Sequence, residues 1–158
     1  MSLIRTLLLT LILVPAVAAA EPLWSAERVD PVAWKSAAIW PPTAIARAVR
    51  TPAGTVVQVT CAVEMGRRVL RLRYADLDRI AERQWKPALV ARVDGAERID
   101  LEYVDRAEWQ SQPLSSNIQA RLHTGNFLVI EQLDGPLRLQ LTGMREALDR
   151  LERMCVPK

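Results

Sequence analysis

The stretch "LTGMREALDRLERMC" (141–155) decides the predicted fold, because it has the pattern of an amphipathic helix that ends in a cysteine. Four residues recur at helical spacing on its apolar face: Met144, Leu148, Leu151 and Cys155. Charged residues cover the opposite face, so the apolar face is expected to pack on the rest of the molecule. Thr142 is the predicted N-cap. We therefore expect the Cys155 sulfur to point into the interior.

The first twenty residues have the three parts of a secretory signal peptide. Arg5 precedes an apolar run from Thr6 to Val14, and Ala18-Ala19-Ala20 forms a small-residue cleavage site before Glu21. A membrane anchor is the alternative, but the run is shorter than the roughly 20 residues that span a bilayer. We expect residues 1–20 to be cleaved and the protein to be exported to the periplasm, without a membrane-spanning segment.

The chain has one other cysteine, Cys61, in the segment "TVVQVTCAVE" (55–64). Side chains alternate along a strand, so Cys61 shares its face with three valines and is expected to point inward. Thiols pair in an oxidising compartment. We predict a Cys61–Cys155 disulfide that ties the terminal helix to this strand. Redox pairs usually lie closer in sequence, and two thiols with one histidine make a poor zinc site, so these alternatives are disfavoured.

Removal of the signal would leave 138 residues with a net charge of +2, which suits one domain and gives no case for a nucleic-acid partner. Residues 21–42 are predicted to be irregular or to form a short helix between Pro31 and Pro41-Pro42. Residues 43–158 are predicted to form a single β-rich domain.

Alternating apolar residues separated by turn signals predict most of this domain. The expected strands are 44–50, 55–64, 68–74, 88–93, 97–104, 126–133 and 137–142. Two short helices are expected at 77–83, capped by Asp76, and at 117–124, capped by Ser115 or Ser116 with Gly125 as a left-handed stop. The predicted fold class is β-rich α+β, a small antiparallel β-sandwich or rolled sheet with a disulfide-tethered C-terminal helix.

The ending Gly143-x-x-x-Ala147-Leu148-x-x-Leu151-x-x-x-Cys155, after a strand pair and an upstream strand cysteine, resembles two groups of small exported proteobacterial proteins. These are the invasion-associated-locus-B-like proteins and the type VI secretion-associated periplasmic proteins. The resemblance covers residues 55–155 and implies a periplasmic β-rich domain whose helix is tied down by a disulfide. It carries over no catalytic residue, and residues 21–42 match no part of it.

Catalytic and metal-binding patterns are sparse. His123 could form a hydrolase triad only with Ser111, Ser115 or Ser116, and no nucleophile elbow is present. Asp76 and Asp78 are too few ligands for a calcium loop. An acid pair such as Glu102 and Glu131 could serve a glycosidase, although nothing marks this pair. No catalytic residue, cofactor site or metal site is predicted.

Two surface features are candidates for binding. The basic cluster in "RRVLRLR" (67–73) offers guanidinium groups for carboxylates or phosphates: Arg67, Arg68, Arg71 and Arg73. Pairing of these arginines with Asp100 and Glu102 on another strand is the alternative. Trp85 and Trp109 lie in segments that look like loops and could form a carbohydrate or peptide platform. The alternative for all five tryptophans, which include Trp24, Trp34 and Trp40, is that they cover an open sheet edge or an end of the core.

These observations favour a non-enzymatic periplasmic binding or accessory protein, an inhibitor, an immunity protein or a secretion-system accessory among them. Its partner is expected to be another periplasmic or envelope protein, or an envelope ligand, and not a nucleic acid. An envelope hydrolase with a sparse carboxylate site is the alternative.

Overall fold

The computed structural model describes residues 24–30, 43–48, 55–76, 88–105, 107–132 and 135–156. The strands within these ranges are β1 (Trp24–Arg28), β2 (Ala44–Ala48), β3 (Thr55–Glu64), β4 (Arg67–Asp76), β5 (Leu89–Val93), β6 (Arg98–Asp105), β7 (Glu108–Ser111), β8 (Phe127–Gln132) and β9 (Gly135–Gln140). The helices are α1 (Ser116–Thr124) and α2 (Met144–Met154).

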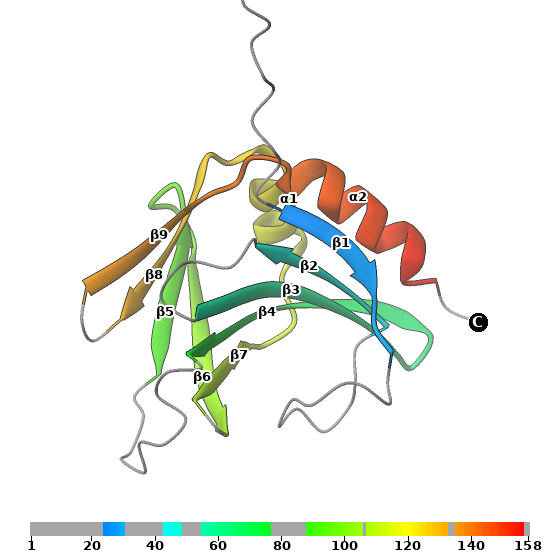
Figure 1. Ribbon diagram of the computed structural model, residues 1–158, viewed down its shortest axis with the longest axis horizontal. Helices are drawn as coiled ribbons and strands as arrows, with labels where there is room; N and C mark the ends of the chain where they lie inside the picture. Colours follow the sequence, from blue (N-terminus) through cyan, green and yellow to red (C-terminus); the bar gives the residue numbers. More distant parts are fainter. Residues whose placement is uncertain are drawn as a thin grey trace, which may run out of the picture.

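All the strands belong to one antiparallel sheet with the order β1-β2-β3-β4-β7-β6-β5-β8-β9. The sheet is strongly curled, so β3 and β4 cross the molecule while β5, β8 and β9 rise at one side (Figure 1). This confirms the predicted β-rich class in its rolled-sheet form. The long β3–β4 hairpin is paired along its whole length, from Thr55–Asp76 to Glu64–Arg67.

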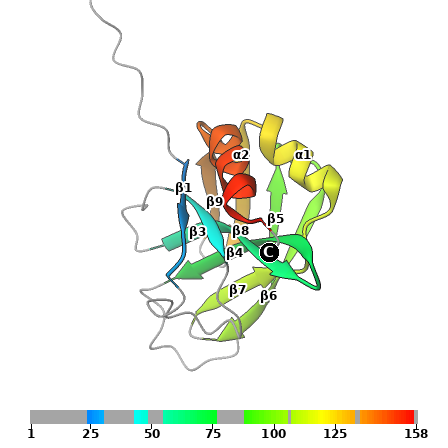
Figure 2. The same cartoon turned by 90° about the vertical axis from the view of Figure 1, so that its right-hand side faces the viewer.

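Both helices lie on the same side of the curled sheet, where they cover its open side (Figure 2). Helix α2 packs on β1 and β2, and α1 packs on α2 and β5. The apolar face predicted for α2 is buried, with Met144, Leu148 and Leu151 at most 1% exposed. In the described part of the chain, neither helix has the length and apolar character required to cross a membrane.

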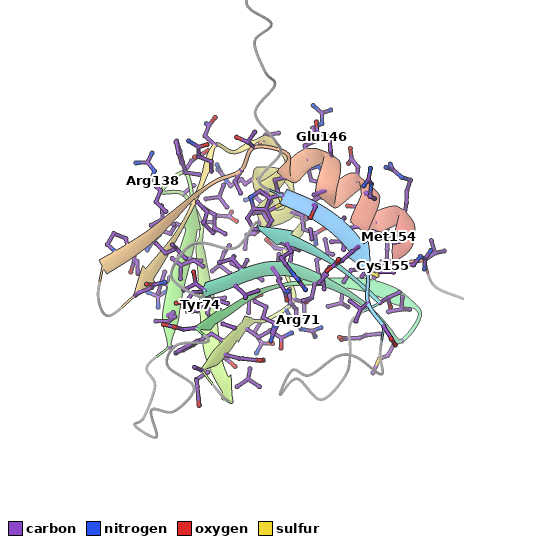
Figure 3. The ribbon with its side chains drawn as sticks, in the orientation of Figure 1. Arg71, Tyr74, Arg138, Glu146, Met154 and Cys155 are labelled. Carbon is purple, nitrogen blue, oxygen red and sulfur yellow. A yellow bond between two sulfur atoms is a disulfide. The ribbon has the colours of Figure 1, made fainter. Side chains whose placement is uncertain are left out.

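The predicted disulfide joins Cys61 of β3 to Cys155 at the end of α2, with a Cα–Cα separation of 6.2 Å. Both cysteines are completely buried. Figure 3 shows Cys155 at the C-terminal end of the helix, above the β3–β4 hairpin. The bond therefore fixes the end of α2 to the interior face of the sheet.

Two strands were not predicted. Residues 24–28 belong to the segment expected to be irregular, yet they form the edge strand β1, and residues 108–111 form β7. Trp24 is buried, and its Nε1 donates to the carbonyl of Gln140 at 2.9 Å. This hydrogen bond joins the two edges of the sheet, β1 and β9. The short helices expected at 77–83 and between Pro31 and Pro41 lie outside the described residues.

Two predicted helix ends were wrong. Helix α2 begins after Gly143, which is its N-cap at φ 83°, and not after Thr142. Gly125 follows α1 with φ −76°, so it is extended and not left-handed. A Cβ at Gly125 would lie 2.5 Å from Cγ1 of Val93, so the position requires glycine for space. The Ser115 cap is confirmed, because its side chain accepts from the Ile118 N–H at 3.3 Å.

Candidate functional site

The predicted basic cluster is divided by the fold, because Arg73 is buried in the sheet. Its guanidinium lies 2.6 Å from a carboxylate oxygen of Glu108 and donates to Oε1 of Gln58 at 2.7 Å. Arg73 and Glu108 are each 8% exposed. The prediction of Arg73 as a surface binding residue was therefore wrong, since it supports the β3–β4–β7 part of the sheet instead.

Arg71 and Arg68 are paired at the surface. Arg71 donates to Glu64 through both terminal nitrogens, with the Nη2–Oε2 distance at 3.0 Å. This hydrogen bonding lowers the pKa of the Glu64 carboxyl. Arg68 lies 3.3 Å from Glu152 of α2. Ion pairing of the cluster was expected, but the partners were wrong.

The two acidic residues that were expected to pair with the arginine cluster, Asp100 and Glu102, have other partners. Asp100 accepts from Nε of Arg98 at 2.6 Å, and Glu102 accepts from the side-chain amide of Gln112. Arg67 is exposed, and the structure records no side-chain partner for it among the residues that it describes. Arg67 is thus the member of the cluster that keeps an uncompensated charge.

Residues 64–68, which we call the hairpin tip, contain the turn between β3 and β4. Met65 and Gly66 at its centre both have positive φ, 49° and 74°. Met65 has a relative exposure of 104%, so its side chain is not packed against the described part of the fold. A left-handed conformation costs an L-residue other than glycine about 1–2 kcal/mol. The hairpin tip therefore combines an unfavourable backbone conformation with a fully exposed apolar side chain.

The hairpin turn between β5 and β6 gives an internal comparison. Asp94 and Gly95 have φ angles of 48° and 70°, nearly the same as those of Met65 and Gly66. Asp-Gly is a preferred pair for such turns. The Asp94 carboxylate also accepts from the backbone N–H groups of Asn126 and Phe127, both at 2.9 Å, which lowers its pKa. The hydrogen bonds of its carboxylate therefore account for an aspartate in the left-handed position at residue 94, whereas no comparable contact accounts for a methionine at residue 65 in the described structure.

The hairpin tip is anchored on two sides. The Arg68–Glu152 pair connects it to the last turns of α2, and the Cys61–Cys155 bond lies a few residues earlier in β3. Figures 1 and 2 both show the hairpin beside the C-terminal end of α2. Sequence reasoning identified the arginines but missed Met65. The available signal was a methionine before glycine, where a hairpin usually has Asn or Asp.

Trp109 was predicted in a loop-like segment, but it lies on strand β7 and is 4% exposed. Its ring packs against those of Tyr74 and Tyr103, with both centroid separations at 5.4 Å. The loop prediction was wrong, and the buried ring does not offer an open platform for a carbohydrate. Trp85 lies outside the described residues.

The candidate catalytic groups are not brought together. His123 of α1 faces two carboxylates of α2, with Nδ1 3.7 Å from Asp149 and Nε2 3.8 Å from Glu152. The Ser111 hydroxyl instead accepts from the Leu72 N–H and donates to the Gln112 carbonyl.

The two carboxylates considered as a glycosidase pair have separate partners. Oε1 of Glu131 lies 3.6 Å from Nε of Arg92, and Glu102 accepts a hydrogen bond from the side-chain amide of Gln112. Among the described residues, no group of three or more His, Cys, Asp or Glu side chains could hold a metal ion.

No protein-family model, curated protein or solved structure matches the chain.

Proposed function

We propose that the protein is an exported periplasmic binding protein that contacts a partner protein through the hairpin tip. Met65 carries this proposal, because it is fully exposed in a left-handed conformation that no recorded contact with the described residues compensates. Non-glycine residues in such conformations cluster at functional sites, where strain is retained for a role outside the fold. The expected role is that of an accessory or inhibitory protein, in line with the resemblance of the C-terminal motif.

The chemistry of the hairpin tip indicates the kind of partner surface. A methionine side chain is flexible and polarisable, and it fits apolar pockets of different shapes. Arg67 supplies a guanidinium that can hold a carboxylate in two parallel hydrogen bonds. A complementary partner would therefore present an apolar pocket beside one or more acidic side chains.

The anchoring of the hairpin tip favours binding. The ion pair to Glu152 and the disulfide restrain the hairpin before any partner arrives. A preorganised loop loses less conformational entropy on association, so more of the contact energy remains as affinity. Because of this preorganisation, we expect the small surface of the hairpin tip to be sufficient for binding a partner.

Affinity capture from envelope extract of the native host tests the proposal. The bait is the oxidised mature protein, compared with the Met65→Asn and Arg67→Glu variants. Arg98→Glu is the matched control, because it changes an exposed arginine near the other hairpin. We expect a protein captured by the wild type and by the control to be lost with both tip variants.

Two results would count against the proposal. The first is a set of captured proteins that is the same for the wild type and the tip variants. The second is the absence of any captured protein together with turnover of peptidoglycan or an ester by the purified protein. Turnover that is lost in Glu131→Gln or Glu102→Gln would instead support the hydrolase alternative.

A further inference from the structure

The sulfur atoms of the chain differ sharply in their surroundings. The sequence contains two cysteines and four methionines. Both cysteines are completely buried and are joined to each other in the disulfide, so neither offers a free thiol. Met1 lies outside the described residues, in the segment that we expect to be cleaved. The thioethers of the mature domain are therefore those of Met65, Met144 and Met154.

Met65 is the exposed member of these three methionines. Its relative exposure is 104%, whereas that of Met144 is 0%. Met154 is partly buried and packs against the core at the C-terminal end of α2, next to Cys155 (Figure 3). A water-borne oxidant must contact the sulfur atom, so the susceptibility of a side chain to oxidation follows its exposure. Thiols would compete for the same oxidant, but both are consumed in the buried disulfide. The geometry therefore favours oxidation at Met65.

Oxidation at this position would alter the surface without damaging the fold. Methionine sulfoxide replaces a flexible apolar side chain with a polar, chiral one. At Met144 the new oxygen would be buried among apolar groups, which is costly. At Met65 it would remain in water, because this side chain is not packed against the described part of the fold. The ion pair and the disulfide that anchor the hairpin tip would keep their partners.

We propose that Met65 is a reversible oxidation site that controls binding at the hairpin tip. This inference rests on the proposed function, because it concerns the same contact. The oxidant is a peroxide: the lone pair of the Met65 sulfur attacks one peroxide oxygen, the O–O bond breaks, and the second oxygen leaves as water. The sulfur gives up two electrons, and the peroxide takes up both. A methionine sulfoxide reductase reverses the step with two thiols, which become a disulfide as the oxygen leaves as water.

The sulfoxide opposes the contact that the hairpin tip is proposed to make. The complementary partner presents an apolar pocket to the Met65 side chain. A sulfoxide oxygen that enters such a pocket loses its hydrogen bonds to water, and an apolar wall replaces none of them, which weakens association by at least about tenfold. The oxidised protein therefore releases its partner while it remains folded.

Peptide mapping by mass spectrometry tests the site of oxidation. The mature, disulfide-bonded protein is treated with hydrogen peroxide, and the sulfoxide fraction of each methionine is followed with time. We expect Met65 to be oxidised roughly tenfold faster than Met154, and Met144 to react only when the protein is unfolded in urea. The urea midpoint of the protein oxidised at Met65 should equal that of the untreated protein. Sulfoxide reductases with dithiothreitol should then restore Met65, while the protein mass shows that the disulfide is intact.

Capture from envelope extract tests the control of binding. The baits are the untreated wild type, the peroxide-treated wild type, and the treated protein after repair by the reductases. We expect the captured protein to be lost after peroxide treatment and to return after repair. Met65→Leu is the matched control, because it keeps an apolar side chain that peroxide does not oxidise. Treatment should therefore leave the proteins captured by Met65→Leu unchanged.

The outcomes separate this inference from the proposed function. Oxidation of Met154 or Met144 at least as fast as that of Met65 overturns the inference. If Met65→Asn loses the captured protein but the peroxide-treated wild type keeps it, the inference is overturned and the proposed function stands. If Met65→Asn and the treated wild type both keep every captured protein, the proposed function fails and the control of binding fails with it.

Discussion

Replacing Met65 with asparagine should stabilise the protein and at the same time abolish its proposed partner contact. The left-handed conformation of Met65 costs about 1–2 kcal/mol, and asparagine tolerates it better because its short polar side chain can hydrogen-bond locally. Met65 is fully exposed, so its removal loses no packing. We expect the free energy of unfolding to rise by about 0.5–1 kcal/mol, since part of the cost remains with asparagine.

Urea unfolding of the disulfide-intact protein, followed by far-UV circular dichroism, measures this change. The urea midpoint should rise while the slope stays constant, because the same surface is exposed on unfolding. The melting temperature should rise by about 2–4 °C for a chain of this size. Met65→Leu is the control: it keeps both the left-handed conformation and the apolar side chain, so stability should stay close to that of the wild type.

A lower stability of Met65→Asn would refute this reasoning, because it would mean that Met65 makes contacts that hold the fold together. If Met65→Asn were more stable than the wild type but bound the partner equally well, the stability prediction would hold and the proposed partner contact would be contradicted. The turn would then be strained, but the strain would serve no contact at this surface.

Three further predictions concern the fold. The Cys61→Ser/Cys155→Ser variant should lose about 4–5 kcal/mol in urea unfolding, the entropy of a loop closed over a sequence separation of 94, and reduced wild type should match it. Arg73→Met should lower the free energy of unfolding by about 3–5 kcal/mol, because it leaves the Glu108 carboxylate buried without this ion pair. A double variant that also carries Glu108→Gln should recover part of this loss, which a double-mutant cycle in urea would measure. The pKa of Asp94 in the folded protein lies below its ordinary value of 3.8, because the carboxylate accepts hydrogen bonds from Asn126 and Phe127. The carboxylate therefore stabilises the fold above about pH 4, and this contribution is lost as the pH falls further. The urea midpoint of Asp94→Asn should accordingly vary less steeply with pH below about pH 4 than that of the wild type.

Most of the sheet could be predicted because its strands alternate apolar and polar residues and are separated by strong turn signals. Strand β3 has the predicted bounds, and the inward face of Cys61 follows from its position in that alternation. The disulfide was predictable for a second reason, since two cysteines allow one intramolecular pairing. Helix α2 was predictable from the spacing of its apolar residues alone.

The missed elements are short and weakly patterned. Strand β7 has four residues between a turn and Pro113, and β1 has five residues in a segment rich in tryptophan and proline. The burial of Arg73 was missed because β7 was missed. Glu108 reaches Arg73 through the pairing of β7 with β4. Alternation along one strand predicts which face a side chain occupies, but it does not predict which distant strand lies beside it.

The candidate site was predicted only in part for a related reason. A run of arginines is visible in the sequence, but whether each one is compensated depends on α2, β7 and the residue before the turn. Met65 could have been noticed from its place before Gly66.

The hydrogen bond between Trp24 and Gln140 spans 116 positions in the chain and has a consequence for the order of folding. Strand β1 leaves the ribosome long before β9 and α2 have been synthesised, so the indole has neither its acceptor nor its covering helix during most of chain elongation. Non-local pairings of this kind are slow and expose unpaired edges meanwhile. The amino-terminal strand should consequently be among the last parts to gain protection from hydrogen exchange, and a nascent chain truncated before residue 140 should depend on a chaperone to avoid aggregation.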